Sequence, residues 1–345
     1  MPLDIASLEA AITEQHLQRP FSGVIFIREN NQTVLAQGYG FANKADEIPV
    51  RVDTRFGVAS GAKIFTAVAI CQLIEKGLLT FDTYLKNCLN ITFPEFDPAI
   101  TIQHLLTHSS GIPDYFDEEV MDDFEALWQD RPMYRLRKPQ DFLALFKDQP
   151  MKFKPGDRCS YNNAGFIVLG LVVEQVSGRP FTQYVEENIF ERAGMTDSGY
   201  FAMDQLPART AYGYIPVGED QWRTNIYAVP IIGGPDGGVF TSVLDMTKFW
   251  DSLLGNKLLK QVTTEKMLTP RMVAEWEGPY IWYGYGVYVH YQDGKVIAYH
   301  IEGSDPGVEF FSCVYPDKKI EYTITANTNK VAWPFVNMND AVKSA

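Results

Sequence analysis

The chain has 345 residues, a length for which about two domains is the usual expectation. Apolar residues make up 46% of it and charged residues 21%, which is ordinary for a globular protein and excludes wholesale disorder. Lysine and arginine total 30 against 43 acidic residues, so the formal net charge is −13. This negative charge repels phosphate backbones and argues against nucleic acid as the main partner.

The start of the chain lacks the pattern of a secretory signal, because Asp4, Glu9 and Glu14 interrupt any apolar run and no basic stretch precedes one. The longest apolar run, around residues 166–173, is too short to span a bilayer. We therefore expect a cytoplasmic protein with no membrane partner. Free thiols, not a disulfide framework, are expected at the four widely spaced cysteines. These are Cys71, Cys88, Cys159 and Cys313.

The predicted elements begin with a short helix at 8–16 and a hairpin of strands at 23–27 and 33–38, joined by turn residues at 29–32. Apolar residues at three- and four-residue spacing predict a helix over 60–76. The next part of the chain is mainly helical, and strands return after residue 237. Further helices are predicted at 102–108, 139–146, 164–176, 181–192 and 333–342, and further strands at 286–291, 295–301, 309–315 and 320–326.

This order of strands, then helices, then strands predicts an α+β fold. One antiparallel sheet would be built from both chain ends and flanked by helices, with a mostly helical lobe inserted. The expected division is an α/β domain of residues 1–80 plus 236–345 and an inserted helical domain of residues 81–235. An active cleft is expected where the two lobes meet.

A Ser-x-x-Lys motif opens the apolar helix at 60–76. Ser60 lies at the predicted helix start and Lys63 one turn on, which places the amine on the same face as the hydroxyl. A serine hydroxyl needs a nearby base to act as a nucleophile, and a buried lysine with a lowered pKa can take part. The alternative without a catalytic role is a serine that caps the helix, followed by a surface lysine.

A second polar group, Tyr161-Asn162-Asn163, precedes the helix predicted at 164–176. In one interpretation an asparagine caps this helix and Tyr161 packs beside it. In the other, Tyr161 is a partly ionised phenol whose pKa is lowered by the Lys63 ammonium, and Asn163 holds Lys63 or a substrate amide.

Together these motifs resemble the serine beta-lactamase-like superfamily, which includes class C beta-lactamases, DD-peptidases, D-aminopeptidases and esterases. Residues 56–63 resemble its nucleophile helix. In chain order, further segments resemble its "HLLTHTSGLP" (102–113), "PG…YSN" (155–163), "LGM" (193–195) and "GGL.ST..D" (237–245). The resemblance covers roughly residues 20 to 330. It implies acyl transfer through an acyl-serine, with Ser60, Lys63 and Tyr161 as catalytic residues and neither a cofactor nor a metal.

The third motif of the superfamily, Lys or His, any residue, then Gly on a strand beside the site, has two possible registers. With Gly303 as the motif glycine, Ile301 takes the cation position; with His300 as the cation, Glu302 replaces the glycine. Residues two apart share a strand face, so only one register holds unless a bulge intervenes. We favour Gly303. The candidate substrate-binding residues are Asn163, His300, Glu302, Gly303 and Ser304.

The favoured register removes the usual cation for a substrate carboxylate. Penicillin turnover and carboxypeptidase action are therefore disfavoured, and small neutral or amine-bearing esters, amides or peptides are the expected substrates. In the expected mechanism Ser60 attacks the carbonyl while Lys63 and Tyr161 share the proton transfers. The N–H groups of Ser60 and of a residue near Ser304 would hold the oxyanion.

Other interpretations compete with this one. The i, i+4 pair His104 and His108 has the spacing of a metal site, but the sequence shows no third ligand, so a structural role in the loop that runs to Pro113 is favoured. Cys159 lacks a histidine partner and is interpreted as an incidental thiol. The alternative from another functional class is a weak or inactive binding protein on the same scaffold, because the third motif is altered.

Overall fold

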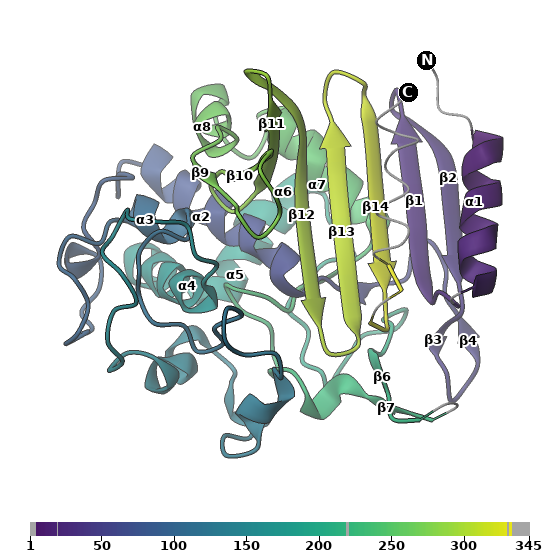
Figure 1. Ribbon diagram of the computed structural model, residues 1–345, viewed down its shortest axis with the longest axis horizontal. Coiled ribbons are helices and arrows are strands. Elements are labelled where there is room, and N and C mark those ends of the chain that lie inside the picture. Colours follow the sequence, from purple (N-terminus) through teal and green to yellow (C-terminus); the bar gives the residue numbers. More distant parts are fainter. Residues whose placement is uncertain (1–4, 19, 219–220, 330, 333–345) are drawn as a thin grey trace.

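A computed structural model describes residues 5–18, 20–218, 221–329 and 331–332 of the chain. Within these residues the main sheet is antiparallel and has eight strands, in the order β2-β1-β14-β13-β12-β11-β10-β9, with most of the helices to its left in Figure 1. Both ends of the chain contribute to it, which confirms the predicted α+β class. The strands are β1 (Gly23–Glu29), β2 (Gln32–Tyr39), β9 (Met272–Val273), β10 (Ile281–Tyr283), β11 (Tyr288–Gln292), β12 (Lys295–Asp305), β13 (Val308–Tyr315) and β14 (Ile320–Ala326).

Tight turns set the register of the two hairpins that the sequence predicts most clearly. Asn30 and Asn31 join β1 to β2 with φ angles of 51° and 63°. Asp293 and Gly294 join β11 to β12 with φ angles of 51° and 79°. Asparagine, aspartate and glycine tolerate this left-handed region best, so these residues favour the two-residue turns that match strand twist.

Three short strand pairs lie outside the main sheet. They are β3 (Phe41–Asn43) with β4 (Ile48–Pro49), β5 (Phe56–Gly57) with β8 (Phe240–Thr241), and β6 (Tyr214–Pro216) with β7 (Trp222–Thr224). The β5–β8 pair matters most for the site, because β5 leads directly into the turn that carries Ser60.

Helices cover both faces of the sheet (Figure 1). On one face α1 contributes Leu8 and Ile12 to a core with β1, β13 and β14. On the other face α7 lies against the sheet, where the Trp250 indole N–H donates to Ser312 Oγ at 2.9 Å. The α-helices are α1 (Ile5–Gln18), α2 (Lys63–Glu75), α3 (Ile102–Leu106), α4 (Asn163–Ser177), α5 (Phe181–Val185), α6 (Glu191–Ala193), α7 (Val243–Leu254) and α8 (Gln261–Met267).

Several predicted elements differ from the observed ones. The helix predicted at 181–192 is divided into α5, a π-helical turn and α6, and the helix predicted at 139–146 is a 3₁₀ helix. The eight strands β3 to β10 were not predicted, because two or three residues are too few to show alternation. The helix predicted at 333–342 lies outside the described residues. The division of the chain into two domains at residues 80/81 and 235/236 stays a prediction.

The remaining helical elements are short turns. They are η1 (Ala59–Ala62), η2 (Leu85–Asn87), η3 (Glu125–Trp128), η4 (Met133–Arg135), η5 (Pro139–Leu145), the π turn η6 (Glu186–Phe190) and η7 (Asn225–Tyr227).

Helix α2 lies at the centre of the molecule. Its residues 63–73 are all buried, so α2 is enclosed all round and packs against α4 as well as other elements of the main core. Residues at three- and four-residue spacing predicted only one buried face. Its first turn therefore lies inside the protein, at the junction of sheet and helices.

Among the described residues, no helix combines the length and apolar character needed to cross a membrane.

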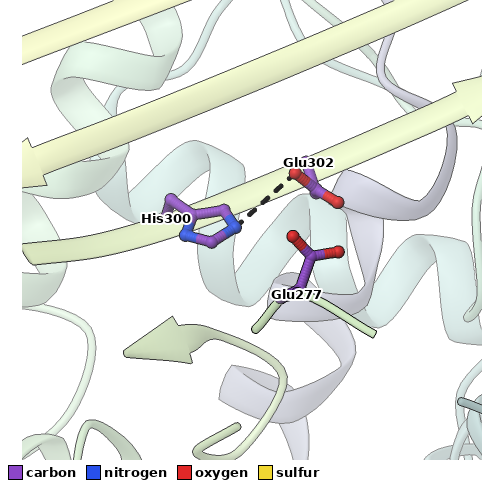
Figure 2. Close-up of side chains that lie close together, drawn as sticks. All are labelled: Glu277, His300 and Glu302. Atoms are coloured by element: carbon purple, nitrogen blue, oxygen red, sulfur yellow. Dashed lines mark ion pairs between the residues drawn. The ribbon is translucent and has the colours of Figure 1, made fainter. Parts of the chain in front are cut away.

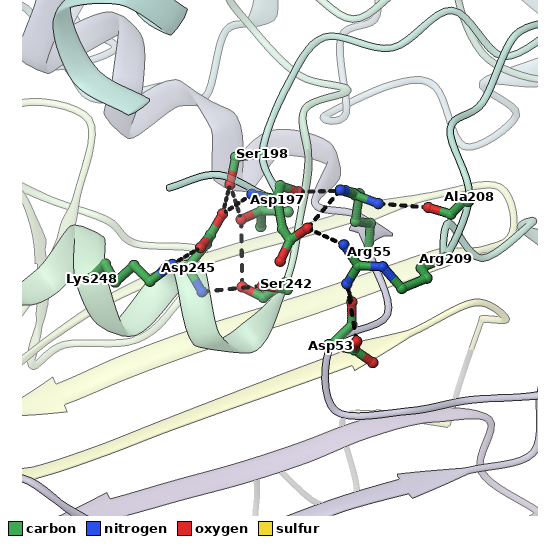
Figure 3. Close-up of polar contacts among 10 residues, drawn as sticks. Asp53, Arg55, Asp197, Ser198, Ala208, Arg209, Ser242, Asp245 and Lys248 are labelled. Atoms are coloured by element: carbon green, nitrogen blue, oxygen red, sulfur yellow. Dashed lines mark hydrogen bonds and ion pairs between the residues drawn. The ribbon is translucent and has the colours of Figure 1, made fainter. Parts of the chain in front are cut away.

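A polar network anchors the segment that precedes Ser60 (Figure 3). The Arg55 guanidinium donates to Asp197 Oδ1 and to the Ala208 carbonyl, both at 2.6 Å. Arg209 donates to the same Asp197 oxygen at 2.6 Å, and also to Asp53. Two guanidinium groups on one carboxylate give short, charge-assisted contacts, which fix the chain just before β5.

The network continues to the start of α7 and accounts for the Thr-Ser-x-x-Asp pattern at 241–245 (Figure 3). Ser242 caps α7 by accepting the Asp245 N–H at 3.2 Å. The fully buried Asp245 carboxylate accepts from the Asp197 N–H, the Ser198 hydroxyl and the Lys248 amine at 2.7–2.8 Å. Because a buried carboxylate needs several donors, this pattern serves the fold and not the reaction.

Candidate active site

Ser60 lies in the 3₁₀ turn η1, immediately after Ala59, whose φ is +45°. A positive φ is strained for alanine and persists only where the surroundings enforce it. Here the Ala59 carbonyl accepts the Gly238 N–H at 3.3 Å. The N-cap positions of η1 and α2 are Val58 and Ala62, so Ser60 caps neither helix. The interpretation of Ser60 as a helix cap is therefore wrong.

Lys63 is buried, with only 2% of its surface exposed, so the interpretation as a surface lysine is also wrong. Its Nζ lies 2.9 Å from Ser60 Oγ, 2.8 Å from Asn163 Oδ1 and 2.7 Å from the Asp236 carbonyl oxygen. Two of these oxygens can only accept hydrogen bonds, whereas the serine hydroxyl can also donate. A neutral amine would thus donate twice to the carbonyls and keep its lone pair for the Ser60 proton.

Burial lowers the pKa of Lys63, and nearby carboxyl groups oppose this shift without reversing it. The carboxyl groups belong to Asp236, Glu118, Asp114 and Asp305. Burial also raises the pKa of Asp114 and of Asp305 to about 7, because desolvation disfavours their charged forms. The site is therefore a dense acidic cluster around one amine.

These acids were missed in the sequence. Asp114 directly follows the segment at 102–113, and Asp236 directly precedes the glycine pair at 237–238, so adjacency to a motif was the available signal. The buried Tyr115 hydroxyl donates to Asp236 Oδ2, a contact that joins the loop after Pro113 to the glycine-rich loop.

Tyr161 presents its ring to the amine. Lys63 Nζ lies 4.9 Å from the ring centroid, and the His108 ring packs on Tyr161 at 4.5 Å. Burial raises the pKa of the Tyr161 phenol well above its usual value, and a hydrogen bond with Ser60 opposes that only in part. The expectation of a partly ionised phenol is thus wrong for the resting site, because Lys63 lies over the ring face and does not depress the pKa of the phenol.

The two roles predicted for the asparagines, capping the helix and holding Lys63, are both present, on different residues. Asn162 caps α4 by accepting the Gly165 N–H at 2.7 Å. Asn163, the first residue of α4, accepts the bond from Lys63, and Asp114 accepts the Asn163 backbone N–H at 2.7 Å. The helix start thus holds the amide that orients Lys63.

Each of the two histidines makes a hydrogen bond that serves the fold. His108 Nδ1 accepts the Asn162 N–H at 3.0 Å, and His104 Nδ1 accepts the Thr101 N–H at 3.2 Å in a capping box. Burial raises the pKa of the Cys159 thiol to about 12, so it stays protonated at neutral pH and is a poor nucleophile. All four cysteines lie within the described residues, and none forms a disulfide there.

The third motif takes the Gly303 register. Residues 299–305 of β12 pair regularly with β13, without a bulge, so His300 and Gly303 face opposite sides of the sheet. A Cβ added at Gly303 would lie 2.6 Å from Ser60 N and 2.8 Å from Gly61 N, so only glycine allows this approach. Ile301, at the cation position, is buried in the core. Pairing with β11 ends at His300, which leaves the edge of 301–305 without a strand partner among the described residues.

His300 and Glu302 lie on the face of β12 opposite to that of Gly303. The His300 ring stacks between Tyr288 and Phe311, at centroid distances of 4.6 and 5.0 Å, and burial lowers its pKa to about 4. It is therefore neutral and offers no cation for a substrate carboxylate. Burial raises the pKa of Glu302 and of Glu277 to about 7. The two carboxyl groups lie side by side near the His300 ring (Figure 2).

A cavity of about 690 Å³ opens beside Ser60. Asn163 and Ser304 line it, whereas His300 and Glu302 do not. Among the described residues, its lining includes many apolar and acidic side chains and neither lysine nor arginine. The aromatic residues are Phe56, Tyr115, Phe116, Phe124, Phe142, Phe201 and Phe240, and the acidic residues are Glu118, Asp122, Asp123, Glu125, Asp236, Asp305 and Glu309.

Comparison with known proteins identifies one family and a similar solved structure. The Beta-lactamase family model matches residues 8–345. The crystal structure of a penicillin binding protein from Bacillus halodurans is 49% identical, covers 97% of this chain and 99% of that one, and superposes with a TM-score of 0.91.

Two curated relatives are more distant. PbpX of Bacillus subtilis is 33% identical over 273 residues, which are 78% of this chain and 62% of that protein. Esterase EstB of Burkholderia gladioli is 30% identical over 226 residues, which are 61% of this chain and 56% of that protein. The chain thus spans less than two thirds of the length of either relative.

The close approach of Gly303 predicts the effect of adding one methyl group. Gly303→Ala should push β12 away from the Ser60 turn, lower the free energy of unfolding by about 1–3 kcal/mol and slow acylation of Ser60 by about 100-fold. Chemical denaturation and the rate of labelling by a fluorophosphonate measure the two effects. Gly218→Ala is the control, since Gly218 is exposed and its added Cβ lies 3.6 Å from the nearest atom of Gln221. Equal labelling rates in the two variants would contradict the prediction.

Proposed function

The chain belongs to the beta-lactamase family, and from this premise we propose that it is a serine hydrolase that cleaves an ester or amide through an acyl-serine on Ser60. One observation carries the proposal: the buried Lys63 amine lies 2.9 Å from the Ser60 hydroxyl, with carbonyl acceptors for its own hydrogens. This arrangement is what a serine needs in order to lose its proton near neutral pH.

In the proposed acylation step Ser60 Oγ bonds to the substrate carbonyl carbon and its proton passes to Lys63 Nζ. The carbonyl oxygen becomes an oxyanion, which the backbone N–H of Ser60 and one from the Gly303–Ser304 edge would hold. The bond from carbon to the leaving oxygen or nitrogen then breaks. The Tyr161 phenol, protonated at rest and hydrogen-bonded to Ser60, gives its proton to the leaving group and regains one from Lys63.

The proposed deacylation reverses these roles. Water attacks the acyl carbon and its proton passes through Tyr161 and Lys63, while Ser60 Oγ leaves and recovers a proton. The products are a carboxylic acid and the free serine. Both halves of the reaction use the same groups, so loss of the amine or of the phenol should slow both.

Covalent labelling tests the assignment of Ser60. A fluorophosphonate should add once to the wild-type chain and not to Ser60→Ala, as read by intact mass and peptide mapping, and wild-type protein should turn over a p-nitrophenyl ester. Ser160→Ala is a matched control, because Ser160 also contacts a lysine, with Lys152 Nζ 3.3 Å from its Oγ, but donates its own proton to Glu119. It should label like the wild type. Label that persists in Ser60→Ala, or a wild-type chain that takes none, would falsify the proposal.

We further propose that the preferred substrate carries an amine and an apolar group. Support comes from the cavity, whose described lining combines seven aromatic rings with seven acids and no basic side chain. Glu118 is the acid best placed to meet a substrate amine, because it lines this cavity and also interacts with Lys63 and Asn163. A substrate carboxylate would be repelled by this lining, which disfavours beta-lactams as substrates.

A pair of substrates tests this preference. The p-nitrophenyl ester of an apolar amino acid should be cleaved with a higher kcat/KM than its N-acetyl derivative, and Glu118→Gln should reduce that ratio by about fivefold or more, as a charged hydrogen bond is lost. The ratio is the readout because a changed pKa of Lys63 affects both esters alike. Glu119→Gln removes the same charge one residue away, where Arg158 holds it at 2.7 Å, and should leave the ratio unchanged. Better cleavage of the N-acetyl ester by the wild type would refute the preference.

A further inference from the structure

We propose that Glu277, His300 and Glu302 form a binding site for one divalent transition-metal ion of the zinc type. The site goes beyond the proposed hydrolase function, and the sequence assigned no metal ligand to any of these residues. Figure 2 shows the three side chains converging from two directions, His300 and Glu302 from strand β12 and Glu277 from the segment before β10.

The spacing of the donor atoms fits a metal. One donor atom from each residue lies within 4.8 Å of the other two, and His300 Nε2 is 3.6 Å from Glu302 Oε2. Two ligand atoms this far apart, each at the usual ~2.0–2.2 Å from zinc, subtend about 120° at the ion, close to tetrahedral. Glu277 is exposed, so its side chain has room to move toward the ion.

The imidazole provides the second, independent observation. His300 is only 3% exposed, and its Nε2 is buried without a hydrogen-bond partner, although it points toward the two carboxyl groups. Natural proteins rarely leave such an atom unsatisfied, since the cost is about 1–3 kcal/mol. A metal ion at this position would take the nitrogen lone pair and remove that cost.

The neighbours of His300 fix both the tautomer and the orientation of its ring, as the neighbours of a metal ligand do. Its Nδ1 lies 2.7 Å from His290 Nε2, and a proton on Nδ1 shared with His290 leaves the Nε2 lone pair facing the carboxyl groups. Metal-bound histidines use their second nitrogen in this way, which fixes the tautomer. The rings of Tyr288 and Phe311, stacked on either side, fix the plane of the imidazole.

The donor set selects the class of ion. An imidazole nitrogen favours zinc and other transition metals, whereas calcium and magnesium take oxygen ligands only. Two carboxylates and a neutral imidazole carry two negative charges, which a divalent ion balances. The exposed side of Glu277 leaves a position for water. Trp276 precedes Glu277 and contacts the Tyr161 ring at 5.9 Å, so the proposed site adjoins the catalytic group.

Metal titration of the full-length chain tests the proposal. After treatment with a chelator and its removal, zinc chloride should bind the wild type at one ion per chain in calorimetry, and cobalt chloride should give a visible absorption band. Magnesium and calcium chlorides should give neither signal. Glu277→Gln and Glu302→Gln should each weaken zinc binding by about tenfold or more, since changes even beyond the first ligands cost that much.

The matched control is Glu275→Gln, which removes an exposed carboxylate from the same segment and is no member of the donor group. It should bind zinc like the wild type, and so should Ser60→Ala, so failure of the metal site is distinguishable from failure of the hydrolase proposal. Because Glu277 is exposed, its variant should fold, which circular dichroism checks. No stoichiometric zinc binding by the wild type, or equal binding by Glu275→Gln, Glu277→Gln and Glu302→Gln, would overturn the site.

Discussion

The burial of one lysine constrains the rest of this structure. Lys63 opens a helix that is enclosed on every side, so its amine has lost water and must find its partners within the protein. The partners come from distant segments: Ser60 from the preceding turn, Asn163 from the start of α4 and the Asp236 carbonyl from the glycine-rich loop. The packing that buries Lys63 therefore also lowers the pKa of its amine, which prepares the amine to accept a proton.

Close backbone approach is the second constraint, and it explains where the fold tolerates strain. Ala59 takes a positive φ just before the nucleophile, and Gly303 lies so close to Ser60 N that a methyl group would collide. Arg55 and Asp197 brace the strand that leads into this turn. Strain at the turn thus has a visible support, which is the usual condition for keeping a reactive group in an unfavourable conformation.

The sequence predicted those site residues that lie in recognisable motifs and missed those that reach the site only through tertiary contacts. Ser60, Lys63, Tyr161 and Asn163 stood in motifs whose resemblance to a family placed them together, and the structure brings them together. Glu118 was missed because its effect on the amine arises from tertiary contacts between loops, which no local sequence pattern shows. The ionisation state of Tyr161 was wrong for the same reason: spacing predicted proximity to the amine, but only the structure shows that the amine meets the ring face.

The β1–β2 hairpin was predicted well because its turn residues determine it locally, whereas α7, a 12-residue helix with one apolar face, was not predicted. Short strands such as β9 and β10 form only by pairing with neighbouring strands, which a short stretch of sequence does not reveal.

The central claim, that a neutral Lys63 takes the Ser60 proton, is tested most directly by the pH dependence of Ser60 acylation. The rate constant for fluorophosphonate labelling should rise with pH and level off well below pH ~10, where an ordinary lysine titrates, and Lys63→Arg should abolish the rise. A rate that stays flat to pH ~10 and then rises would contradict the account.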